Sequence, residues 1–305
     1  MYVSLKAGPV VRANGRKLNQ PPYVGLFPPL RARVNCSHDF RLSVKDLDGD
    51  KVRCRLAQPE QGECIDCTPY PFIQLHKEEC ILTFTGEAPA GQYFIYLMVE
   101  DLIPSRQISL TTDSPPLSSI PAHLSLTVEE STTSCSDEPI VTGGTPKKDT
   151  MLLALPYQQV KFNVNFMSQL ESVLEVAVVG PPELYRVGFQ LVGPLAMMTM
   201  SWVRSGNKLA RLLPICFAAN TNSLQSEPRC VWLFQREMKA LPAGTELRCD
   251  KMEMTLVLPL TSLRNINLNE LQPNSSTCPI TYNSTHLTAH ISLDGCGTKT
   301  VVTYT

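Results

Sequence analysis

Four residues that can bind a soft metal ion lie close together in the first third of the chain. Cys64, Cys67, His76 and Cys80 form a C-x2-C-x8-H-x3-C pattern, and thiolate and imidazole are the ligands of structural zinc sites. The spacing fits no zinc module that we can name, and in an oxidised chain the same thiols pair as disulfides. The pattern therefore favours disulfides and keeps zinc as the weaker alternative.

Three aspartates alternate in the segment DLDGD. Asp46, Asp48 and Asp50 resemble the start of a calcium-binding loop, but the glutamate that closes such a loop is missing, because Ala57 stands at its position. A tight Asp-Gly hairpin between DFRLSV and KVRCRLA explains the same residues. Calcium is thus also a weaker alternative.

The chain carries no recognisable catalytic motif. It lacks G-x-S-x-G, H-E-x-x-H and a phosphate loop, and His286 and His290 fall on the solvent face of an alternating strand, with no acid expected nearby. The 27 basic and 28 acidic residues form no long run of one sign, which argues against binding of nucleic acid or anionic lipid. We expect no enzyme activity and no cofactor.

Eleven cysteines indicate an oxidising compartment. Three N-glycosylation acceptor motifs, at Asn35, Asn274 and Asn283, agree with a secretory route. The first twenty residues lack the apolar core of a signal peptide, and no apolar stretch is long enough to span a membrane. We interpret both absences as truncation: an extracellular protein, with any membrane attachment lying in sequence beyond this chain.

Short apolar runs bounded by Pro, Ser, Thr, Asn and Asp predict an all-β chain of many short strands. Seven such runs in about 100 residues fit an immunoglobulin-like sandwich, in which Tyr93 could form a tyrosine corner. The expected organisation is an unstructured lead (1–30), a first sandwich (31–130), a linker (131–150), a second sandwich (151–240) and a third unit (245–305).

One disulfide follows from the predicted strands of the second sandwich. LLPICFAA and RCVWLF read as neighbouring strands, and the polar segment between them is long enough to turn back. A bond between Cys216 and Cys230 is therefore expected. In the first sandwich, Cys36, Cys54 and Cys135 are available as well as Cys64, Cys67 and Cys80, and the disulfide connectivity there stays open.

The C-terminal segment holds the most specific pattern. Cys249 is followed by alternating methionine and aliphatic residues in KMEMTLVLPL, Cys278 follows a leucine-rich stretch, and Cys296 opens a Cys-Gly-Thr triplet. The combination resembles the first part of the ZP-N half of a zona pellucida (ZP) domain, over residues 249–305.

The resemblance implies a disulfide pattern. In that family ZP-N is an immunoglobulin-like fold whose four cysteines pair first to fourth and second to third. Cys249, Cys278 and Cys296 would be the first three, so the resemblance implies a Cys278–Cys296 bond. The chain ends at Thr305, before the fourth cysteine and the ZP-C half, so the ZP-N unit is expected to be incomplete and Cys249 unpaired.

The resemblance also implies a function. ZP proteins polymerise into extracellular filaments and matrices, so the expected parent protein is a structural glycoprotein whose partners are other ZP-domain or extracellular proteins. The first alternative is an adhesion or receptor-like ectodomain that binds a partner through the upstream sandwiches. An intracellular zinc-binding adaptor is a third reading, which requires reduced thiols.

Overall fold

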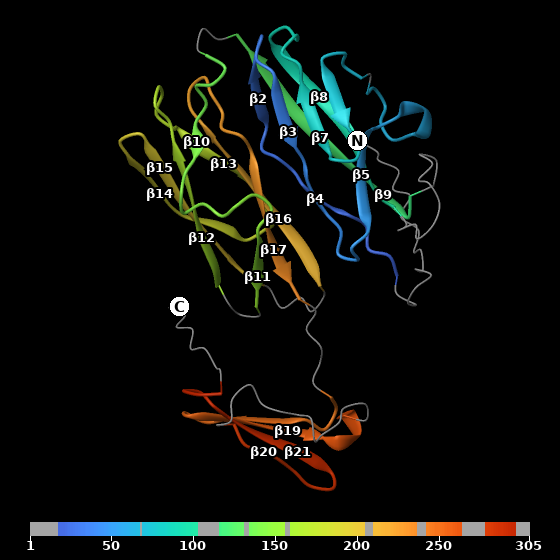
Figure 1. The fold of residues 1–305 in the computed structure, drawn as a ribbon, viewed down its shortest axis with the longest axis vertical. Coiled ribbons are helices and arrows are strands. Elements are labelled where there is room, and N and C mark those ends of the chain that lie inside the picture. Colours follow the sequence, from blue (N-terminus) through green and yellow to red (C-terminus); the bar gives the residue numbers. More distant parts are fainter. Residues whose placement is uncertain are drawn as a thin grey trace. The chain divides into compact units, whose positions relative to one another are not determined.

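The computed structural model describes residues 18–67, 69–102, 116–130, 134–155, 159–204, 210–236, 242–263 and 278–296. Nearly every regular element in these ranges is a β-strand (Figure 1). The chain divides into two compact units, residues 1–237 and 238–305. The first unit contains two immunoglobulin-like sandwiches, so the predicted fold class is confirmed.

The first sandwich has two sheets. One has the strand order β2-β9-β8-β5, and the other has the order β3-β7-β6, extended by the pair β1-β4 because only Leu42 separates β3 from β4. The strands are β1 (Tyr23–Gly25), β2 (Leu30–Arg33), β3 (His38–Arg41), β4 (Ser43–Lys45), β5 (Lys51–Leu56), β6 (Ile73–His76), β7 (Ile81–Phe84), β8 (Gly91–Leu102) and β9 (Ser118–Glu129).

The strand order and one tyrosine identify this sandwich as immunoglobulin-like. Strand β2 runs parallel to β9, whereas the other pairs are antiparallel. The hydroxyl of Tyr93, near the start of β8, donates a 2.8 Å hydrogen bond to the carbonyl oxygen of Pro89. This is the tyrosine corner that the sequence suggested.

Two expectations for this region were wrong. The lead was expected to be unstructured through residue 30, yet β1 lies within it and pairs with β4; residues 1–17 lie outside the described part. No Asp-Gly hairpin joins DFRLSV to KVRCRLA, because β4 pairs with β1 and β5 pairs with β8 in the opposite sheet. The connection at Asp46–Asp50 therefore crosses between sheets.

The second sandwich repeats the architecture. Its sheets have the orders β10-β12-β15-β14 and β11-β17-β16-β13, and β11 runs parallel to β17. The strands are β10 (Ile140–Val141), β11 (Met151–Ala154), β12 (Gln159–Met167), β13 (Glu175–Val179), β14 (Leu184–Val192), β15 (Leu195–Val203), β16 (Arg211–Asn220) and β17 (Arg229–Gln235). The expected linker at 131–150 therefore contains the first strand of this sandwich; residues 131–133 lie outside the described part.

Alternating side chains build the second core. Phe162, Val164 and Phe166 of β12 are buried, as are Met198 and Met200 of β15. The residues between them along these strands are more exposed, apart from Ser201 near the end of β15. The methionines therefore fill the core of the sandwich.

Strand β17, in the middle of one sheet of the second sandwich, is buried on both faces. Val231 and Leu233 of β17 belong to the core of their own sandwich, whereas Cys230 belongs to the core cluster of the first. Trp232, on the same face as Cys230, is fully buried. Figure 1 shows β16 and β17 beside β4, so the two sandwiches form one packed unit.

The second unit is a single antiparallel sheet of order β18-β19-β21-β20. Its strands are β18 (Glu246–Cys249), β19 (Glu253–Pro259), β20 (Ile280–Tyr282) and β21 (His286–Ser292). Among its described residues, 242–263 and 278–296, only Cys278 and Leu287 are buried. One described face of apolar residues is therefore left partly open.

Candidate functional site

A buried hydrogen-bond cluster joins the two sandwiches. The indole nitrogen of Trp232 on β17 donates to the hydroxyl of Ser43 on β4 at 2.9 Å and lies 3.3 Å from Oδ1 of Asp149. The Ser43 hydroxyl in turn donates to the Asp149 carboxylate. Because Trp232 and Ser43 are both buried, each polar atom needs its partner in place, which fixes the junction geometry.

Beside this cluster, the backbone of β1 at Gly25 lies very close to a disulfide of the second sandwich. A β-carbon added at Gly25 on β1 would lie 2.8 Å from Sγ of Cys216 and 2.9 Å from Sγ of Cys230. These cysteines face each other across β16 and β17 and form the expected disulfide, with their Cα atoms 4.0 Å apart. The first sandwich thus packs its backbone directly on this disulfide.

Hydrogen bonds line another part of the junction. The Arg31 guanidinium donates to the carbonyl oxygens of Thr221 at 3.1 Å and Asn222 at 2.8 Å. The Gln225 side chain accepts from the backbone nitrogen of Arg31 and donates to the carbonyl oxygen of Pro29, both at 2.9 Å. Together with the apolar contacts, these bonds hold the sandwiches as one body.

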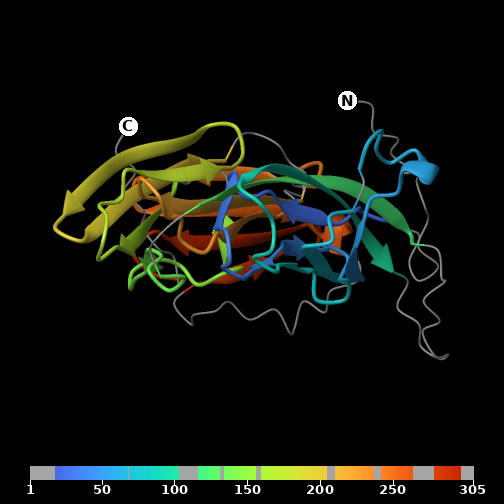
Figure 2. The same cartoon turned by 90° about the horizontal axis from the view of Figure 1, so that it is seen from above.

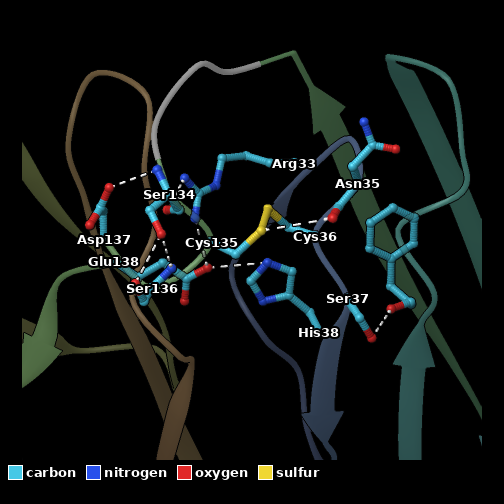
Figure 3. The surroundings of a disulfide bond; sticks show 11 residues. Arg33, Asn35, Cys36, Ser37, His38, Ser134, Cys135, Ser136, Asp137 and Glu138 are labelled. Carbon is cyan, nitrogen blue, oxygen red and sulfur yellow. Dashed lines mark hydrogen bonds and ion pairs between the residues drawn. A yellow bond between two sulfur atoms is a disulfide. The ribbon is translucent and has the colours of Figure 1, made fainter.

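A disulfide ties the segment after β9 to the turn after β2 (Figure 3). Cys36 and Cys135 are bonded with their Cα atoms 5.5 Å apart. Nearby, the Arg33 guanidinium donates a 2.7 Å bond to the carbonyl oxygen of Ser134, and Nε2 of His38 lies 3.1 Å from Oε1 of Glu138. The disulfide and these two contacts therefore fix the connection between β9 and β10 to the first sandwich.

Burial shifts the pKa of two side chains beside the Cys36–Cys135 disulfide. Removal from solvent raises the pKa of Glu138 to about 7, against the lowering effect of Arg33 and with a smaller raising effect of Glu227. Burial also lowers the pKa of His38, helped by Arg33 and opposed by Asp39. Below about pH 7, and above the lowered pKa of His38, a protonated Glu138 beside a neutral His38 is therefore the favoured state of the pair.

The raised pKa of Glu138 predicts a dependence of stability on pH. A carboxyl with a raised folded-state pKa stabilises the fold below its unfolded value, near 4.5, and this contribution is lost as pH rises through about 7. His38 acts in the opposite sense, since its lowered pKa stabilises the fold above about 6.5 and this contribution is lost as pH falls. Glu138→Gln removes the first effect and keeps the imidazole.

We expect Glu138→Gln to be more stable than the natural chain at pH 8.5, by about 1–2 kcal/mol after allowance for the partial solvent exposure of the group. The difference should shrink toward zero at pH 5. Urea unfolding of both proteins across this range measures it, with Glu60→Gln on an exposed turn as the control. A gap between the two proteins that does not change with pH would contradict the assignment.

The edge strand β14 is apolar and exposed. Tyr185, Val187, Phe189, Leu191 and Val192 are each between 38% and 60% exposed, and Figures 1 and 2 show the β14–β15 hairpin at the periphery of its sandwich. The strand pairs with β15 on one side and ends the sheet on the other. Exposed apolar edges of this kind are typical of strand-addition interfaces.

The predicted calcium aspartates separate in the structure. Carboxylate oxygens of Asp46, Asp50 and Asp101 lie within 4.8 Å of one another, whereas Asp48 accepts from the backbone nitrogen of Gln20 at 2.8 Å. Asp101 lies at the end of β8 and could not be found from local spacing. Calcium binding by Asp46, Asp48 and Asp50 together is therefore not supported by their placement, although Asp46 and Asp50 do lie close to each other.

The zinc alternative is wrong, because the three cysteines of the proposed zinc site are all in disulfides. Cys64 pairs with Cys67, and Cys80 pairs with Cys54, while His76 lies exposed on β6. No set of four free ligands is left. These pairs, with Cys36–Cys135, supply the connectivity that the sequence left open.

The predicted cysteines and one acceptor asparagine of the second unit lie in its described part. Cys278 and Cys296 are bonded, and Cys249 is free and exposed. Asn283 is exposed, and its Oδ1 accepts from the backbone of Thr285 and His286, which leaves Nδ2, the atom that a glycan modifies, outside these bonds.

Of the other two acceptor asparagines, Asn35 is exposed on the first sandwich, and Asn274 lies outside the described residues.

The expectation that His290 has no acid nearby was wrong: its Nδ1 lies 3.6 Å from a carboxylate oxygen of Glu253 on the adjacent strand. Both groups are substantially exposed, so this is a surface pair.

These features define a class. Tandem immunoglobulin-like sandwiches with four disulfides, in a chain whose second unit carries a fifth, are typical of extracellular structural or interaction proteins. In the described part of the chain, no helix has the length and apolarity needed to cross a membrane.

Comparison with known proteins gives structural neighbours but no family. No family model and no curated protein matches the chain. Similar solved structures include the titin z1z2 domains in complex with telethonin, at 11% identity over 72% of this chain and 99% of that one, with a TM-score of 0.24. An I-band fragment of titin has 13% identity over 90% and 88%, with a TM-score of 0.23. The sialic acid binding region of a Streptococcus sanguinis adhesin has 8% identity over 79% and 93%, with a TM-score of 0.24. The fold assignment above therefore depends on the strand pairing.

Proposed function

We propose that this chain belongs to an extracellular structural glycoprotein of the zona pellucida type, whose parent protein polymerises into a filament or matrix with other ZP-domain or extracellular proteins. Catalysis plays no part in this function.

The observation that carries the proposal is the arrangement of the second unit. The Cys278–Cys296 bond links the residues before β20 to the turn after β21, as expected for the second and third cysteines of a ZP-N half. In the same sheet, Met254 faces Ile291 and Leu258 faces Leu287 across β19 and β21. This apolar face, and the free Cys249, agree with a sheet that requires a second layer and a further cysteine.

The proposal predicts a gain of assembly when the module is completed. Residues 1–305 secreted alone should form no regular filaments and should label at Cys249 with a thiol reagent. The same residues joined to the rest of a ZP module should form filaments in negative-stain electron microscopy, with Cys249 protected. Cys249→Ser in the completed protein is the matched variant and should assemble poorly. Regular filaments from residues 1–305 alone, or a completed protein with a reactive Cys249, would contradict the proposal.

A second function is favoured by the exposed strand β14. An adhesion or receptor-like ectodomain would bind an extracellular protein through the upstream sandwiches, and an apolar edge suits strand addition. The same experiment separates the two functions, because a completed protein that stays monomeric while residues 18–236 retain a partner on cell surfaces would support the adhesion function.

A further inference from the structure

One disulfide differs from the others in the size of the ring that it closes. Cys64 and Cys67 are three positions apart, whereas the other pairs in the described part of the chain are 14, 18, 26 and 99 positions apart. The stabilisation that a disulfide gives by restricting the unfolded chain grows with ring size. Reduction of Cys64–Cys67 therefore costs the fold least.

The same disulfide is accessible. It follows the one-turn 3-10 helix Pro59–Gln61 in a surface loop, and Ile65 between its cysteines is 85% exposed. Neither Cys64 nor Cys67 is buried. Both cysteines are buried in Cys54–Cys80 and Cys216–Cys230, and Cys278 is buried in its pair. Cys36–Cys135 has one buried and one exposed cysteine, so Cys64–Cys67 is the described pair in which neither cysteine is buried.

The charges around the loop distinguish the two sulfur atoms. Cys67 lines a cavity of about 530 Å³ together with Arg55, Lys77 and Glu60. Arg55 is already ion-paired with Glu63 and Glu100, so Lys77 is the cation that would act on a Cys67 thiolate. Nearby cations stabilise a thiolate and make it a better leaving group. On the other side, the Glu63 carboxylate next to Cys64 is held by a bidentate ion pair with Arg55, at 2.7 and 2.6 Å. The ion pair keeps this part of the loop in place.

We propose that Cys64–Cys67 is a thiol-exchange site, which reacts with an extracellular dithiol while the sandwiches stay folded. The thiolate of the dithiol attacks Sγ of Cys64, an S–S bond forms between them, and the Cys64–Cys67 bond breaks with its electron pair leaving on Cys67. The second thiol of the dithiol then attacks the mixed disulfide, which releases Cys64 as a thiolate and leaves the dithiol oxidised. Both thiolates take up protons from water, so this chain gains two electrons and two protons.

The exchange changes the surface of the first sandwich. The covalent ring holds the loop that forms one wall of the cavity beside Leu56, Pro59 and Leu75. Once the ring is open, the loop retains only its non-covalent contacts, among them the Arg55–Glu63 pair. Oxidation state therefore controls how firmly this cavity is formed.

The test is disulfide-specific labelling of the full chain. Cys249 is first blocked with iodoacetamide, the protein is titrated with dithiothreitol, and the released thiols are labelled with N-ethylmaleimide and mapped by mass spectrometry. We expect Cys64 and Cys67 to be labelled at several-fold lower reductant concentrations than the Cys216–Cys230 and Cys278–Cys296 pairs, because each of those pairs has a buried cysteine whereas neither Cys64 nor Cys67 is buried. The near-ultraviolet circular dichroism should be retained at that point.

Two further measurements test the chemistry. With limiting glutathione in place of the dithiol, the adduct should map to Cys64 and the free thiol to Cys67. Lys77→Gln should slow the exchange about threefold or more by destabilising the leaving thiolate, whereas Lys161→Gln on β12 of the second sandwich should leave it unchanged. Reduction of Cys64–Cys67 together with or after the other pairs would overturn the proposal, and a glutathione adduct at Cys67 would overturn the direction of attack.

Discussion

Gly25→Val is expected to lower the free energy of unfolding of the first unit by about 3 kcal/mol. A β-carbon at this position would meet both sulfur atoms of Cys216–Cys230 at under 3.0 Å. The disulfide cannot move aside, because both cysteines are buried and lie directly opposite each other in the β16–β17 pair. The clash must therefore separate β1 from β16, which opens the junction between the sandwiches.

Denaturant unfolding followed by tryptophan fluorescence measures this effect, because Trp232 lies in the junction. Gly143→Ala is the matched control, since a β-carbon there meets nothing within 4 Å. An unfolding midpoint for Gly25→Val equal to that of the control would show that the two sandwiches do not pack as described.

Removing the Cys36–Cys135 bond is expected to have an effect of similar or larger size. The double variant Cys36→Ala/Cys135→Ala releases a ring of 99 positions, for which the chain-entropy estimate is about 4–5 kcal/mol. Cys36→Ala also keeps the acceptor pattern at Asn35, so glycosylation is not changed with it.

The matched comparison is Cys64→Ala/Cys67→Ala, whose ring is three positions long and for which the same estimate gives about 2 kcal/mol. Equilibrium urea unfolding under non-reducing conditions compares the two double variants with the natural chain. If both lost the same stability, ring size would not be what determines the contribution of these disulfides.

Local patterns in the sequence account for the strands. In β12 and β15, alternate positions are apolar, and the faces that this alternation predicts are the ones buried. The Cys216–Cys230 bond could be expected because both cysteines lie in adjacent apolar strands joined by a polar turn. Tyr93 could be recognised because its position after Gly91 at a strand start is local as well.

Contacts between distant segments could not be predicted in this way. Asp101 approaches Asp46 only because β8 and β5 pair in one sheet, and no local spacing records that pairing. Gly25 looks like an ordinary loop glycine until Cys216 and Cys230 are placed against it. The expected Asp-Gly hairpin failed for the same reason, because turn residues also suit a crossing between two sheets.

The parallel strand pairs give the first unit a mechanical property. In each sandwich the strand near the start, β2 or β11, runs parallel to the last strand, β9 or β17. Tension between the two ends of a sandwich therefore pulls these strands lengthwise past each other and loads their hydrogen bonds together rather than one after another. Because these hydrogen bonds would have to break together, a sandwich connected in this way is expected to resist stretching once the tension reaches this strand pair.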